Sequence, residues 1–371
     1  MDTNADGQIH LWNVHDGVTA LVGAQQRFNI VGRIEHPVET LALDARLNGG
    51  PWFPIAVNLT GRPRAARLPA AGDFNIDAIN VEDLQPSNVL EVRQTRTDGK
   101  KFATRVRFDI RRTDPTDHRF TLSLRPGEIE EFGQVVDGGW RVVRDEDGLS
   151  LGISRETAGY DRIVLFGDRR WTTGYEIEAC LTVDEWTHCV HNVGLLFKWN
   201  PHRAGTGAEL PVTWSTGLAY YASSSPGLRL RFGVNVTYSN GVRHGDYVLQ
   251  ERPRAWWTRI PRRATAVVWY VSRRRWVLSQ LRPGIRYRFH ARVDPSAYTL
   301  SVWRDGRRAP RSPQLLVHTP PELLERGAVG LIAENAVVRL HQFSVHPVGG
   351  RGDGSGAEAT AAASSDLEKR D

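Results

Sequence analysis

The stretch from Arg326 to Val348, RGAVGLIAENAVVRLHQFSVHPV, decides the fold class of this chain. Glycines and a proline bracket it, and its apolar residues do not recur at helical spacing. Val329 and Leu331 share one face of a strand, and Glu334 and Asn335 form a turn after it. We therefore expect two strands of a large antiparallel sheet.

The second of these strands changes phase along its length. Val338 and Leu340 lie on one parity, whereas Phe343 and Val345 lie on the other. Because a β-bulge adds one residue to a strand, a single slip near His341 would keep all four side chains on one face. The sequence therefore predicts a bulge there.

Strand patterns continue through the rest of the chain, and no segment has a convincing amphipathic helical period. TLALDARL, Thr40 to Leu47, alternates and then meets Asn48-Gly49-Gly50, a tight-turn sequence that predicts a hairpin. Strands are short up to about residue 110 and longer afterwards, with a segment rich in Arg, Thr, Asp and Pro at 111–128 between them. We expect an all-β chain with a small immunoglobulin-like sandwich at 1–125, a jelly-roll sandwich at 126–348 and a disordered tail at 349–371.

Composition excludes some classes of function. The net charge is +6, and 44 of the 48 basic residues are arginines scattered among acids, without a nucleic-acid-binding motif. No run approaches the ~20 apolar residues of a membrane helix. MDTNADGQIHLW lacks the pattern of a signal peptide, which leaves the compartment open. Two cysteines, Cys180 and Cys189, make no disulfide framework, although they would close a local turn if oxidised.

Several stretches resemble a known architecture. RFNIVGRI, LALDARLNGGPWFPIAV and RLPAAGDFNIDAINVEDLQPSNVLEVRQTRTDG resemble the immunoglobulin-like module of bacterial, largely actinobacterial, two-domain proteins. GYDRIVLFGDRRW, GLLFKWNPH and the closing stretch resemble their second module, which belongs to the concanavalin A-like lectin and glucanase superfamily. The resemblance covers most of residues 9–348.

The resemblance implies a fold and a preference for carbohydrate, with an extracellular or cell-surface location. It does not imply an activity, because most such proteins lack an assigned one. Relatives often carry an acidic residue in the final strand, where this chain has Leu340-His341-Gln342-Phe343. No calcium or sugar contact is therefore carried over to that position.

Carboxylates for glycoside hydrolysis would alternate along one strand, so that an acid and a nucleophile flank one bond. The nearest match is Glu176-Ile177-Glu178, but Cys180 occupies the third position of that row. We interpret the two glutamates as water-facing residues of a strand whose other face is core. No catalytic residue is therefore expected, and the sequence favours a protein without enzymatic activity.

Metal motifs are incomplete. Residues 2–9 match the first half of a calcium-binding loop, but Asn13 stands where the loop needs its final glutamate. His188, Cys189, His191 and His202 fit no standard zinc spacing, which favours a loop with incidental histidines. We expect no metal and no cofactor.

Aromatic residues are dense in the middle of the second module, and rings that stack on the C–H faces of sugars are typical of carbohydrate sites. We expect a ligand groove where a strand ending in KWNPH meets a long Gly- and Ser-rich loop at 201–227. Arg162 and Asp168 are candidates to line this groove, but a core ion pair between them explains both residues equally well. The predicted carbohydrate-binding residues are Trp199, Asn200, His202, Trp214, Tyr220, Tyr221, Arg162 and Asp168.

Three functions stay open at this point. The first is a non-catalytic carbohydrate-binding or cell-envelope module, with a polysaccharide or glycan as partner. The second is a glycoside hydrolase or polysaccharide lyase on the same sandwich. The third is a structural or interaction protein without a sugar ligand. Oligomeric state is not encoded in any pattern of the sequence.

Overall fold

The computed structural model describes residues 8–22, 27–55, 57–60, 70–113, 119–124, 129, 133–146, 148–159, 162–171, 174–188, 191–203, 213–223, 228–239, 242–249, 281–294, 297–318 and 327–348. Between residues 200 and 249 the description covers strand positions and register. Strands dominate, and the helices of these ranges are two 3-10 turns, Pro37–Glu39 and Val81–Asp83. The expectation of an all-β sandwich fold is confirmed. In the described ranges no helix has the length and apolar character to cross a bilayer.

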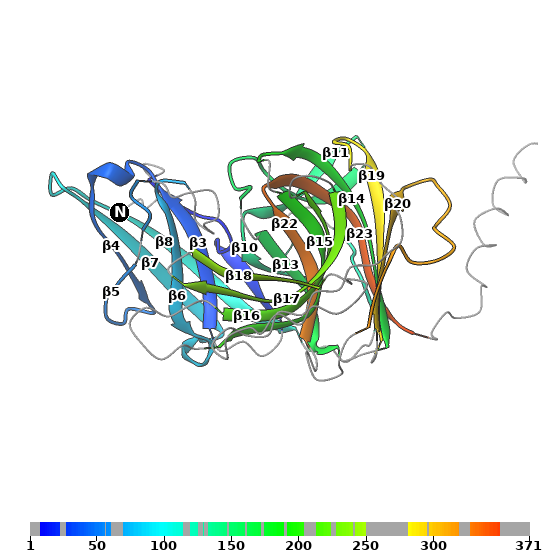
Figure 1. Ribbon diagram of the computed structural model, residues 1–371. Coiled ribbons are helices and arrows are strands. Elements are labelled where there is room, and N and C mark those ends of the chain that lie inside the picture. Colours follow the sequence, from blue (N-terminus) through cyan, green and yellow to red (C-terminus); the bar gives the residue numbers. More distant parts are fainter. Residues whose placement is uncertain are drawn as a thin grey trace, which may run out of the picture.

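The N-terminal part of the chain, up to Thr113, forms two facing sheets (Figure 1). A three-stranded sheet contains β1 (Ile9–Leu11), β3 (Arg27–Ile34) and β6 (Asp73–Asn80). A five-stranded sheet has the order β2 (Gly17–Val22), β8 (Lys101–Thr113), β7 (Ser87–Arg96), β4 (Thr40–Leu47) and β5 (Phe53–Pro54). The two sheets pack through a shared apolar cluster in which Phe28 stacks on Phe108, with ring centroids 5.9 Å apart. The predicted hairpin is confirmed, since β4 pairs with β5 after a turn in which Asn48 and Gly49 both have positive φ.

The strands from Phe120 to Pro347 form a larger sandwich (Figure 1). Its seven-stranded sheet has the order β10 (Gln134–Asp137), β13 (Arg162–Trp171), β22 (Gly327–Glu334), β15 (His191–Arg203), β16 (Thr213–Ser223), β17 (Leu228–Ser239) and β18 (Val242–Leu249). Its eight-stranded sheet contains β11 (Trp140–Asp145), β12 (Gly148–Ile153), β23 (Ala336–Pro347), β14 (Tyr175–Trp186), β19 (Arg286–Val293), β20 (Ala297–Arg304) and β21 (Leu315–His318), with β9 (Phe120–Thr121) beside β23.

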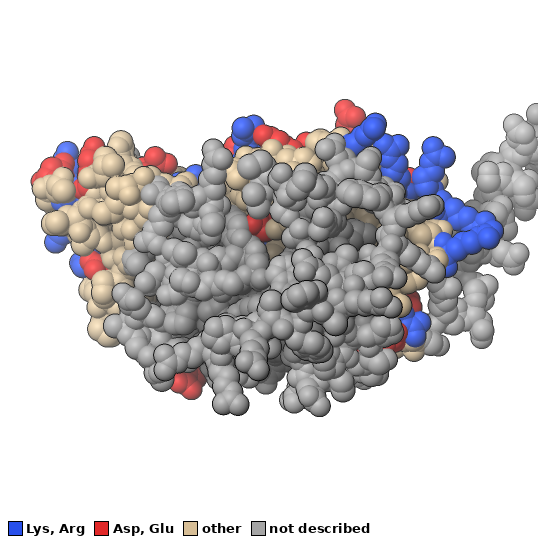
Figure 2. All heavy atoms as spheres, in the orientation of Figure 1, with Lys and Arg blue, Asp and Glu red and all other residues tan. Residues whose placement is uncertain are grey.

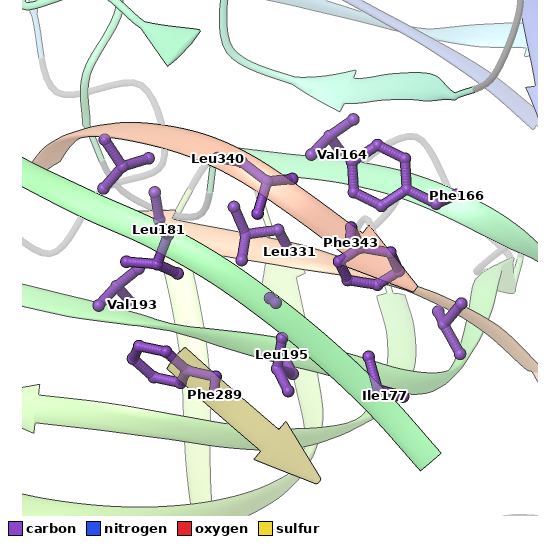
Figure 3. Close-up of a cluster of buried hydrophobic side chains, with 14 of the residues drawn as sticks. Val164, Phe166, Ile177, Leu181, Val193, Leu195, Phe289, Leu331, Leu340 and Phe343 are labelled. Carbon is purple, nitrogen blue, oxygen red and sulfur yellow. The ribbon is translucent and has the colours of Figure 1, made fainter. Parts of the chain in front are cut away.

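Side chains from both sheets interdigitate in one core, as Figure 3 shows. Leu331 and Leu195 enter it from the seven-stranded sheet, and Leu340 and Phe289 enter it from the eight-stranded sheet. Each of these side chains is fully buried. Burying a side chain of this size contributes about 1.5–3 kcal/mol, so this layer is the main source of stability for the second sandwich.

The closing stretch of the sequence forms the two predicted strands, β22 and β23. β22 and β23 are joined at Asn335, whose φ is 50°. The backbone N–H of Asn335 donates to the carbonyl oxygen of Gly159 at 2.6 Å. The predicted bulge is confirmed, because Cys180 pairs with Gln342 and the next residue, Leu181, pairs with Leu340. Residue 341 is therefore the inserted one.

The assignment of β22 and β23 to one sheet is wrong. β22 lies between β13 and β15 in the seven-stranded sheet, whereas β23 lies between β12 and β14 in the opposite sheet. Both are central strands, and the turn at Asn335 carries the chain across the core. The apolar pattern of a strand shows which face is buried but does not identify its hydrogen-bonding neighbours, so sequence could not separate these arrangements.

The two sandwiches meet through polar side chains. The side-chain Nδ2 of Asn29 donates to the carbonyl oxygen of Val136 at 2.7 Å. The side-chain Nδ2 of Asn13 donates to the carbonyl oxygen of Val135 at 3.2 Å. Leu122 packs in the second core, ahead of the expected boundary at residue 125. The two apolar clusters share no residue. That the two parts fold separately stays a prediction.

Candidate functional site

The predicted ligand residues of β15 lie where the strand is irregular. Phe197 pairs with Gly217, Asn200 pairs with Ser215 and Arg203 pairs with Thr213. Two residues of β15 thus oppose one residue of β16 twice in succession, at 198–199 and at 201–202. These are two β-bulges within the KWNPHR end of β15.

The second bulge brings two predicted ligand residues to a third. Pro201 and His202 lie opposite Trp214, since they fall between the Asn200–Ser215 and Arg203–Thr213 pairs. Bulges are common next to functional sites because they re-aim side chains that a regular strand would alternate. Asn200, His202 and Trp214 therefore occupy register positions at one end of the β15–β16 hairpin.

Tyr220 and Tyr221 lie elsewhere on the same strand pair. They pair with Gly194 and Val193, six and seven residues along β16 from Trp214. At about 3.4 Å per residue this is roughly 20 Å. The expected long loop at 201–227 is wrong in its central part, which is the strand Thr213–Ser223. β16 belongs to the sheet instead of covering it.

Trp199 is a buried residue. Its side chain is 1% exposed, and its backbone pairs with Ala328 of β22. It is absent from the core cluster between the sheets, so it lies on the other face of the seven-stranded sheet together with buried Leu196 and Ile332. In this position the ring stabilises the bulged end of β15 and offers no surface to solvent.

Arg162 forms a buried ion pair with Asp137. The core ion pair with Asp168 that the sequence suggested lies outside the described residues. Nη1 of Arg162 donates to the Asp137 carboxylate at 2.6 Å, and both side chains are 1% exposed. Its Nε donates to the carbonyl oxygen of Thr157 at 2.8 Å, and its guanidinium carbon lies 5.0 Å from the ring centre of Trp12. Arg162 therefore ties β10 and β13 to the first sandwich. Asp168 lies on β13, and its side chain is outside the described residues.

The histidine group considered for zinc is not assembled. His191 and His202 are eleven residues apart on β15, roughly 35 Å along the strand. The His191 ring stacks on Trp186 at 3.8 Å, and its Nδ1 lies 2.8 Å from the carbonyl oxygen of His188. Burial lowers the pKa of His191. Cys189 is outside the described residues.

Cys180 is a free thiol in this structure, so no disulfide involves it. It lies on the outer face of the eight-stranded sheet, opposite Arg288. Burial raises the pKa of the Cys180 thiol to about 11, and the nearby Asp305 carboxylate adds to the effect. A thiol with this pKa is a poor nucleophile at neutral pH, so Cys180 has a structural role.

A cluster of two glutamates and one histidine lies on that same outer face. Glu176 and Glu178 project from β14 on the side opposite to the buried Ile177. β19 places His290 directly across from Glu178. One ligand atom from each of the three side chains lies within 4.8 Å of the others. The sequence showed the two glutamates but not the histidine, which is more than a hundred residues away and becomes a neighbour only through strand pairing.

A basic surface surrounds the end of β20. Figure 2 shows Lys and Arg side chains gathered at the right-hand edge of the view, where Figure 1 places β20 and the loop after it. Arg307, Arg308 and Arg311 are exposed there and Arg304 is half-buried. Within the described ranges none of these four has an acidic partner. This surface would attract an anionic polymer more than a neutral one.

No protein-family model matches the chain, and no curated protein matches it. Among solved structures, a GH43 protein from Bacillus licheniformis aligns at 10% identity and a TM-score of 0.35, covering 88% of this chain and 64% of its own. The chain thus spans less than two thirds of that protein. A β-porphyranase from Bacteroides plebeius aligns at 8% identity and a TM-score of 0.30, covering 64% of this chain and 95% of its own. An alginate lyase from Klebsiella pneumoniae aligns at 8% identity and a TM-score of 0.28, covering 56% and 84%. At these TM-scores neither the fold type nor the chemistry of these proteins transfers to this chain.

Proposed function

We propose that this protein is a non-catalytic carbohydrate-binding module, with its ligand contacts at the bulged end of β15 and β16. The observation that carries the proposal is the pair of successive bulges that sets Asn200 and His202 beside Trp214. Bulges of this kind present side chains that a regular strand would send to opposite faces. A polysaccharide chain needs this combination of a ring for its C–H face and polar groups for its hydroxyls.

The resemblance to immunoglobulin-like and concanavalin A-like modules supports the same class of ligand. Asn200, His202 and Trp214 make the contacts in this proposal, and Trp199 supports the strand beneath them. Tyr220 and Tyr221 are consecutive on β16, so only one of the two shares a face with these contacts and extends the surface along the strand. Asp168 stays a candidate contact on β13, which β22 separates from β15, and Arg162 holds that strand. Arg162 does so through its buried pair with Asp137.

Binding to a panel of neutral and acidic polysaccharides tests the proposal. We expect the full-length protein to bind at least one of them in affinity electrophoresis. Trp214→Ala should weaken that binding about tenfold or more, because loss of one stacked ring costs one to a few kcal/mol. The matched control is Trp52→Ala in the first sandwich, where the ring lies between Arg46 and Arg93 at 4.7 and 4.1 Å. This control should bind like the unaltered protein.

Three results would contradict the proposal. Failure to bind any polysaccharide would favour a structural or interaction protein. Release of new reducing ends or unsaturated products from the same panel would favour the glycoside hydrolase or lyase alternative. An equal loss of binding in Trp214→Ala and Trp52→Ala would place the ligand elsewhere.

A further inference from the structure

We propose that Glu176, Glu178 and His290, on the outer face of the eight-stranded sheet, bind a divalent transition-metal ion, for which Zn²⁺ is the best match. The site is separate from the proposed carbohydrate contacts, which lie on the opposite sheet of the sandwich. Two carboxylates and one imidazole supply the ligands, with one donor atom from each within 4.8 Å of the others.

Strand geometry holds the three side chains together. Glu176 and Glu178 are two residues apart on β14, so they share a face at a separation of about 7 Å along the strand. His290 is the direct cross-strand partner of Glu178, and Arg292 is that of Glu176. The β14–β19 pairing has no register shift from Tyr175 to Thr182. A regular ladder on two long strands makes a rigid platform for ligands.

The His290 imidazole points to an ion more than to a hydrogen bond. Its Nε2 lies 3.3 Å from Oε2 of Glu176, yet this buried nitrogen makes no hydrogen bond within the described part of the chain. Tetrahedral zinc with bonds of about 2.0–2.2 Å places its ligand atoms roughly 3.3–3.5 Å apart. The nitrogen and oxygen therefore have the spacing of two ligands of one ion, without the alignment of a donor and an acceptor.

Neighbouring groups complete the electrostatic arrangement. Oε1 of Glu176 lies 3.7 Å from Arg292, whose Nε donates to Asp294 at 2.6 Å. Arg292 therefore orients one carboxylate oxygen of Glu176 and leaves the other oxygen toward His290. Partners that orient a metal-binding carboxylate in this way are common around metal sites. Glu178 makes no hydrogen bond in the described ranges, although the Arg288 guanidinium is close enough to interact with its charge. Its side chain is exposed and can rotate toward an ion.

The donor set selects the kind of ion. Calcium and magnesium prefer six or more oxygen ligands, whereas an imidazole with carboxylates suits zinc and its neighbours in the first transition row. Three protein ligands leave at least one coordination position for water or for an oxygen ligand. Because Glu178 is exposed, that position faces solvent.

Titration of metal-stripped, full-length protein with Zn²⁺ in a calorimeter tests the inference. We expect one equivalent to bind, and Glu178→Gln and His290→Gln each to weaken binding by at least about tenfold. Glu185→Gln is the matched control, since Glu185 lies on the same strand but pairs with Arg155 at 2.7 Å. Co²⁺ serves as a second probe, and its visible absorption should report nitrogen and oxygen coordination that disappears in His290→Gln.

The experiment separates a loss of metal binding from a loss of the fold. Thermal melting of the apo variants should match that of the unaltered protein, because the three side chains are half-buried or exposed. Absence of saturable Zn²⁺ binding would overturn the inference. Binding of one equivalent that survives both substitutions would also overturn it, since other histidines would then be the ligands. Neither result depends on whether the protein binds a polysaccharide.

Discussion

The two sheets of the second sandwich differ in regularity. In the seven-stranded sheet every neighbouring pair contains a register shift, from β10–β13 to β17–β18. In the eight-stranded sheet the shifts are confined to the β14–β23 pair. Each bulge increases local twist and bends its strand. The seven-stranded sheet is thus built to curve and to redirect side chains, and the eight-stranded sheet is built as a regular platform.

The outer faces of the two sheets differ as well. On the seven-stranded sheet, Ile163, Leu165, Leu196 and Ile332 are buried and lie outside the core cluster between the sheets. On the eight-stranded sheet the corresponding face carries carboxylates, arginines and His290. The first face is a second apolar layer, whereas the second face meets water. Substitutions at matched residues on the two sheets should therefore lower the free energy of unfolding by different amounts.

Trp199→Ala should have the largest effect on stability. The ring is 1% exposed, and removal of a buried aromatic side chain costs about 3–5 kcal/mol. Its counterpart is Trp303→Ala on β20 of the eight-stranded sheet, where the ring is half-buried. This substitution should lower the free energy of unfolding by less than half as much. Denaturant unfolding followed by circular dichroism measures both. Equal losses would show that the two outer faces do not differ in burial.

A matched pair of carboxylates should show the next largest difference. Asp137→Asn leaves the buried guanidinium of Arg162 without its counter-charge and should cost about 3 kcal/mol. Asp184→Asn in the eight-stranded sheet should cost about 0–1 kcal/mol, because its partner Arg339 is partly exposed and also pairs with Asp145. The midpoints of thermal unfolding compare the two variants. If Asp184→Asn were the more damaging, burial would not be the deciding factor.

Two glycines provide the smallest contrast. A Cβ at Gly330 of β22 would overlap the carbonyl oxygen of Val164 on the neighbouring strand, so Gly330→Ala should cost about 1–3 kcal/mol. A Cβ at Gly152 of β12 would meet Val143 Cγ2 at 3.2 Å, a methyl group that can move. Gly152→Ala should therefore cost less than about 1 kcal/mol. Chemical denaturation of both variants provides the check, and similar costs would mean that the central strand of the bulged sheet can adjust.

The sequence by itself determined the local structure. Alternating apolar residues, the Asn48-Gly49 turn and the phase slip at His341 each follow from interactions between residues close in the chain, and the structure has all three. The burial of Ile177 and the solvent-facing side of Glu176 and Glu178 followed from the same two-residue period.

Only the tertiary structure decided which strands are neighbours. β22 and β23 separate into opposite sheets, β16 joins the sheet where a loop was expected, and His290 reaches Glu178 across a strand pair. Trp199 and Arg162 have the residue types of a ligand site, but the packing around them buries both. Strand pairing and burial depend on residues far apart in the chain, and the two-residue period that marks a strand carries no information about its partner.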